Sequence, residues 1–186
     1  MLFGSSKDEA DRATLKAMKA LFTAADKDLA QALAVEMGNR YAPVQRQILL
    51  AFFVHACFDR LWDDPAKPAT LARFHEQALE LHWHEWAKTR PEPGRTIAQH
   101  KLDALGEVKA RHAEFAAAFA TDLDKASLYK DIPVRLSEIS EAGARALFAL
   151  DAEEQDRGRR VLLARLHAYF RAIVWRIEHP EGEAKL

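Results

Sequence analysis

The sequence predicts an all-α protein, built as a bundle of about six helices. Apolar residues recur at intervals of three and four along most of the chain, which is the spacing of one face of an α-helix. Glycine and proline are scarce and separate these periodic segments, and no useful length of chain alternates as a β-strand does. Loops of about five to eight residues favour antiparallel neighbours. We therefore expect the first four helices to form an up-down core with the last two packed alongside, an orthogonal array being the alternative.

The first two expected helices differ in how much of their surface is apolar. The first spans about 30 residues and ends at Gly38, a natural C-terminal stop. The second begins at Pro43, which suits a first helical turn, within residues 42–64, the most apolar helix-length segment. Apolar side chains surround most of its circumference, apart from a polar strip that includes Arg46 and Arg60. A helix that is apolar nearly all round is a buried one, so we expect the rest of the chain to pack around it.

The third and fourth expected helices have clear boundaries. The third covers about residues 70–88 and ends where two prolines and a glycine follow in residues 91–94. Thr96 and Gln99 have the spacing of a capping box, and the fourth helix follows them to about residue 121.

The last two expected helices follow a segment with a weaker pattern. Residues 122–133 are predicted to form a structured connection, which could include a helical turn or two before Pro133. A short fifth helix then covers about residues 134–150. The sixth covers about residues 151–178 and has the cleanest amphipathic pattern in the chain.

Length and composition predict one soluble domain, residues 1–186, with short flexible ends at about 1–6 and 180–186. The single cysteine, Cys57, cannot form an internal disulfide, and the N-terminus lacks the features of a signal peptide, which favours a cytoplasmic location. The apolar runs are too short for a membrane span. Because the net charge is −1, no overall positive charge attracts nucleic acid, and nucleic-acid binding is not expected.

Inward-facing histidines are the main candidate for a functional site. Helical projection places four of the eight histidines on apolar faces of three consecutive helices: His55, His75, His82 and His112. Asp59 lies one turn after His55, and Glu36 falls on the apolar face of the first helix. Imidazoles and carboxylates inside a helical bundle are typical ligands of a transition metal or haem. The sequence thus suggests His55, Asp59, His112 and either His75 or His82 as ligands, with Glu36 as a fifth group.

Only one of His75 and His82 can join such a site, because seven residues separate them by about 10 Å along a helix. The stronger metal spacings, such as H-E-x-x-H, are absent. Two other interpretations remain open. In the first, the histidines are separate core residues, and a hydrogen bond between Asp59 and His55 only fixes packing. In the second, the histidines form a pH-sensing cluster.

A second candidate site is an exposed aromatic and basic surface. The outer side of the sixth helix carries Trp175 among Arg165, Arg171 and Arg176, and Phe148 is expected to point away from the apolar stripe of the fifth helix. Aromatic residues amid arginines are typical of protein interfaces, so we expect a protein partner or a homodimer there. A solvated face, or one covered by another segment of the chain, is the alternative.

Catalytic chemistry has little support in the sequence, and no catalytic residue is predicted. No G-x-S-x-G motif or phosphate-binding glycine loop is present, and Cys57 lies in an apolar segment where a thiol tends to be inert. No cofactor is required. The favoured hypothesis is an interaction or regulatory protein that binds a partner through exposed helix faces. The alternative is a bundle that binds a metal or haem for storage, sensing or oxygen chemistry.

Overall fold

The computed structural model describes residues 5–38, 41–65, 67–89, 94, 96–119, 125–148 and 152–180. Within these ranges it describes all side chains except those at positions 5–11, 79, 81–89, 97, 101 and 127. The expected flexible ends, 1–6 and 180–186, lie largely outside the described residues.

Six helices account for almost all of the described chain, and the prediction of an all-α fold is confirmed. They are α1 (Ser5–Met37), α2 (Pro43–Leu61), α3 (Lys67–Thr89), α4 (Ile97–Phe119), α5 (Lys125–Leu147) and α6 (Ala152–Glu178). No strand occurs among the described residues. None of these helices, over the part of the chain that the structure describes, is long and apolar enough to cross a membrane.

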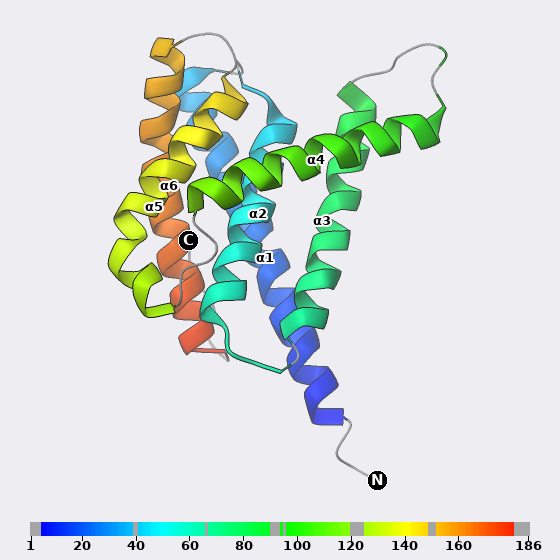
Figure 1. The fold of residues 1–186 in the computed structure, drawn as a ribbon, viewed down its shortest axis with the longest axis vertical. Coiled ribbons are helices and arrows are strands. Elements are labelled where there is room, and N and C mark those ends of the chain that lie inside the picture. The colour runs from blue at the N-terminus through cyan, green and yellow to red at the C-terminus, as the bar shows by residue number, and fades with distance from the viewer. Residues whose placement is uncertain are drawn as a thin grey trace.

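Helix α2 lies at the centre of the bundle and contacts each of the other five helices (Figure 1). Those five form a closed ring around it, in which neighbours touch in the order α1, α3, α4, α5, α6 and back to α1. In the view of Figure 1, α4 crosses in front of α2 and is steeply inclined to α3. Within the described residues α1 and α4 make no contact. The expected up-down core of the first four helices is therefore not confirmed, whereas the central place of α2 is.

Burial of α2 follows from its apolar surface. From Gln45 to Leu61 every side chain is buried except three, which are half-buried: His55, Asp59 and Arg60. Two aromatic pairs attach α4 to the apolar side of α2. Phe52 lies 5.8 Å from Phe115 and Phe53 lies 5.8 Å from Phe119, between ring centroids. The three half-buried residues are thus the side of α2 that the surrounding ring does not fully cover.

Two of the predicted helix boundaries are confirmed in atomic detail. Gly38 has a φ of 63°, and its amide donates to the carbonyl of Ala34 at 3.0 Å, so it ends α1 in a conformation that favours glycine. Thr96 and Gln99 form the capping box before α4. The Thr96 amide donates to Oε1 of Gln99 at 2.9 Å, and the Gln99 amide donates to Oγ1 of Thr96 at 3.3 Å.

The predicted connection at residues 122–133 is wrong, because α5 begins at Lys125 and continues through Pro133. A proline inside a helix removes one hydrogen bond at a cost of about 3 kcal/mol. Four apolar residues at helical spacing nevertheless keep one face of α5 buried on both sides of that proline: Leu128, Ile132, Leu136 and Ile139. Pro133 itself is exposed, so its ring is accommodated at the surface. Burial of this continuous face outweighs the local preference for a break.

The expected exposure of Phe148 is also wrong, because only 2% of this residue is exposed. Its ring packs directly on the backbone of α6 at Gly158, where an added Cβ atom would overlap the ring. The chain turns at the end of α5, and the amide of Phe148 still donates to the carbonyl of Ala144 at 2.9 Å. The sequence prediction treated Phe148 as part of a regular helix, whereas the chain turns there and brings its side chain onto α6.

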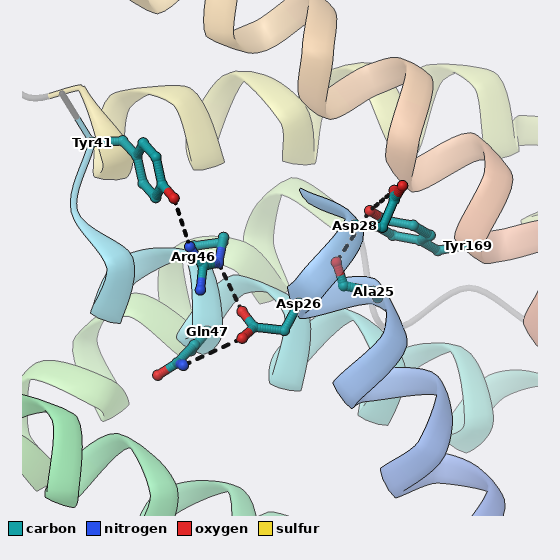
Figure 2. Close-up of polar contacts among 7 residues, drawn as sticks. All are labelled: Ala25, Asp26, Asp28, Tyr41, Arg46, Gln47 and Tyr169. Atoms are coloured by element: carbon teal, nitrogen blue, oxygen red, sulfur yellow. Dashed lines mark hydrogen bonds and ion pairs between the residues drawn. The ribbon is translucent and has the colours of Figure 1, made fainter. Parts of the chain in front are cut away.

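A polar network joins α1 to α2 and α6 (Figure 2). Nε of Arg46 donates to Asp26 at 2.7 Å, and Nη1 of Arg46 donates to the hydroxyl of Tyr41 at 3.0 Å. Two residues further along α1, Asp28 accepts a hydrogen bond from the hydroxyl of Tyr169 at 2.7 Å. One turn of α1 therefore fixes the helix against two neighbours, through partners that the sequence alone did not pair.

Candidate functional site

A cleft of about 700 Å³ lies between α2, α3 and α4, where three of the predicted histidines meet. Its apolar walls include Phe52 from α2 and Leu71 from α3. Five side chains with nitrogen or oxygen groups complete its lining: His55, Asp59, Arg60, His75 and His112. The half-buried strip of α2 thus forms one wall of the cleft.

The three imidazoles come from three different helices and are in contact through His75. The ring centroids are 5.8 Å apart for His55 and His75 and 5.1 Å apart for His75 and His112. Phe52 approaches the ring of His112 at 5.6 Å, edge to face. The apolar faces predicted for these helices therefore do bring three of the four inward histidines together.

Asp59 lines the same cleft beside two basic groups. Its carboxylate lies 3.7 Å from Nε of Arg60 and 4.0 Å from Nζ of Lys67. Nζ of Lys67 also donates to the backbone carbonyl of Asp59 at 2.9 Å. These two cations therefore balance the negative charge of Asp59. The suggested hydrogen bond from His55 to Asp59 is not formed among the described residues.

Arg60 has a polar group that the rest of the described protein leaves unused. Its Nε atom is buried and has no hydrogen-bond partner among the described residues. Buried N–H groups are nearly always hydrogen-bonded in proteins. Sequence reasoning placed Arg60 only on the polar strip of α2. The signal that it belongs to the site was its position next to Asp59, which lies one turn after His55.

Burial keeps two of the histidines neutral near pH 7. It lowers the pKa of His55, the neighbouring His75 lowers it further, and Asp59 partly opposes these effects. Burial likewise lowers the pKa of His75, against an opposing effect of Glu76. A neutral imidazole offers one N–H donor and one nitrogen acceptor, so the cleft presents hydrogen-bonding groups from three helices.

The predicted metal ligands are only partly brought together. His55, His75, His112 and Asp59 share the cleft, whereas Glu36 is exposed on α1 and lines a separate hollow with residues of α6. The side chain of His82 lies outside the described ones. Over the described part of the chain, no three His, Cys, Asp or Glu side chains are arranged so that they could hold a metal ion.

The predicted partner surface on α6 is smaller than the sequence suggested. Trp175 is 38% exposed and stacks on His179, with ring centroids 4.9 Å apart. Arg171 is exposed, and Arg165 lies 3.3 Å from Asp28 in an ion pair with α1. Arg176 is half-buried and lines a hollow beside Trp62. Phe148, as described above, is buried and takes no part in this surface.

Comparison with protein families, with curated proteins and with solved structures found no significant match to the chain.

Proposed function

We propose that this protein is a ligand-responsive regulatory protein that binds a small molecule in the cleft between α2, α3 and α4. One observation carries the proposal: imidazoles from three helices and the half-buried side chain of Arg60 line one cleft of about 700 Å³. Ligand sites typically have volumes of about 300 to 1,000 Å³, apolar walls and a few convergent polar groups. The cleft has all three features.

Binding fits the lining residues better than catalysis does. Among the described residues that line the cleft, none carries a hydroxyl or a thiol that could act as a nucleophile. Cys57 is fully buried in α2, and burial raises the pKa of its thiol, which keeps it protonated and inert.

A ligand in this cleft would contact three helices at once and so stabilise their packing. Ligand that binds only the folded state raises the free energy of unfolding by mass action. Helices α3 and α4 are also neighbours in the ring around α2. Ligand binding would therefore make α3 and α4 more rigid and change the surface that they present to a partner. This change is the basis for a regulatory role.

Blocking the cleft provides a test of this proposal. Ala113 lines the cleft and is exposed, so Ala113→Trp should fill the cleft while the protein still folds. The matched control is Ala168→Trp, an exposed position on α6, which contributes no residue to the cleft. In ligand-observed NMR with a library of neutral, anionic and cationic fragments, we expect a set of compounds that bind the wild type and the control but not Ala113→Trp. If no compound distinguishes the two variants, the cleft is not a ligand site.

We also propose, as a second candidate function, that α6 presents a binding surface to a second copy of the chain or to another protein. The observation that favours it is the partial exposure of Trp175 next to basic side chains, since tryptophan and arginine are common centres of protein interfaces. Self-association gives the simplest test because it needs no other component.

Trp175→Ala and Arg171→Glu should each reduce association at least tenfold and leave the fold intact, because both side chains are exposed on α6. Light scattering over a concentration series would measure self-association, and a pull-down would detect a different partner. The control is Arg157→Glu, at an exposed position nearer the start of α6. Association that is unchanged in both variants would exclude this surface.

A further inference from the structure

We infer that the molecule bound in the cleft is a small organic anion, a carboxylate with an apolar body, and that Arg60 binds its charged group. This inference rests on the proposed function, which leaves the class of ligand open.

Arg60 supplies the first argument. Its Nε atom is buried and makes no hydrogen bond to any of the described residues. The carboxylate of Asp59 lies 3.7 Å away, close enough to balance charge but too far for a hydrogen bond. The side chain of Arg60 is nevertheless 30% exposed and lines the cleft, so its guanidinium group can donate to a ligand carboxylate, and hydrogen bonds between these two groups are among the strongest in proteins.

The balance of charge around the cleft gives the second argument. Asp59 is the only carboxylate among the described lining residues, and it lies beside both Arg60 and Lys67. A cationic ligand would bring a third positive charge to that group. An anionic ligand would bring the summed charge of Asp59, Arg60, Lys67 and the ligand close to zero. It would also accept hydrogen bonds from the imidazole N–H groups.

The apolar walls indicate that the anion is organic. Phe52, Leu71 and Pro68 line the cleft together with alanines of α3 and α4. Pro68, Ala72 and Ala113 are the exposed part of this apolar lining, and an inorganic anion such as phosphate would leave them in water. A hydrocarbon or aromatic body would cover them and gain free energy from that burial.

Calorimetric titration with three matched probes at one pH tests the inference. The probes are 4-phenylbutyrate, its amide and the corresponding amine, which share one apolar body and differ in charge. We expect the carboxylate to bind at least tenfold more tightly than the amide, and the amine to bind most weakly. Arg60→Gln should remove the preference for the carboxylate without weakening the amide. Arg60→Lys, which keeps the charge but lacks Nε, should retain only part of that preference.

The possible outcomes separate this inference from the proposed function. If amide or amine binds as tightly as the acid, and Ala113→Trp abolishes that binding, the cleft is a ligand site but the anion inference is wrong. If Arg60→Gln folds normally by circular dichroism and keeps the preference for the acid, Arg60 is not the anion-binding group. Binding of hemin or Zn²⁺ that is lost in His75→Ala, without binding of any of the three probes, would replace the anion with a metal-containing ligand.

Discussion

Replacing Arg46 with methionine should lower the free energy of unfolding by about 2 to 4 kcal/mol. The side chain of Arg46 is 8% exposed and that of Asp26 is 21% exposed, so their ion pair of 2.7 Å lies mostly out of water. Removing one partner leaves the other charge partly buried without its counter-ion. The substitution also removes the hydrogen bond to Tyr41 and the contact of the guanidinium with the face of its ring. Urea denaturation followed by circular dichroism would measure the change.

An exposed ion pair provides the control for that experiment. Arg145 and Glu141 lie 2.8 Å apart on α5, with side chains that are 48% and 63% exposed. Exposed pairs of this kind contribute little, so Arg145→Met should change the free energy of unfolding by less than about 0.5 kcal/mol. Equal effects of Arg46→Met and Arg145→Met would show that the network around Asp26 does not hold α1 against α2.

Acidification from pH 7.5 to 5.5 should destabilise the protein through His55 and His75. Burial lowers the pKa of both groups in the folded state, below the value of 6.5 that a histidine has when unfolded. The unfolded chain therefore binds more protons in this range, and the free energy of unfolding falls with pH. The stability that their neutral forms provide is fully present above pH 6.5 and is lost as pH falls toward the folded-state values. Each group contributes at most about 1.4 kcal/mol per pH unit.

Variants identify the histidines as the source of this slope. His55→Gln combined with His75→Gln should make the free energy of unfolding much less dependent on pH between 7.5 and 5.5. His167→Gln, at an exposed position on α6, is the matched control for the loss of a histidine outside the cleft. Urea denaturation at three pH values would measure each slope. A double variant with the slope of the wild type would mean that the cluster does not titrate as its burial implies.

The parts of the fold that sequence predicted well are those decided within one helix. Helix α2 is recognisable because its apolar residues surround it, and burial at the centre of the ring follows directly. Gly38 and the pair Thr96 and Gln99 mark their boundaries because local backbone chemistry decides them. Pro133 misled the prediction because its local effect was outweighed by burial of residues on both sides, which depends on α5 packing against α6. The ring around α2 depends on contacts between helices that no single segment encodes.

The same distinction explains the candidate site. Helical periodicity placed His55, His75 and His112 on inward faces, and the structure brings them together because α3 and α4 both pack on α2. Periodicity carries no information about the relative rotation of helices, so Glu36 was expected at the site although it lies on another side of the bundle. The role inferred for Arg60 follows from its place in the lining of the cleft, which depends on how α3 and α4 pack against α2.

Histidine-selective NMR is the most direct test of the claim that the cleft between α2, α3 and α4 is the functional site. With the imidazole Cε1 carbons labelled with ¹³C, 4-phenylbutyrate would be added while all eight histidine signals are followed. We expect the signals of His55, His75 and His112 to shift together with one dissociation constant, while those of the exposed His167 and His179 stay in place. Signals of the three cleft histidines that remain unchanged at saturating ligand, or shift only along with the exposed ones, would contradict it.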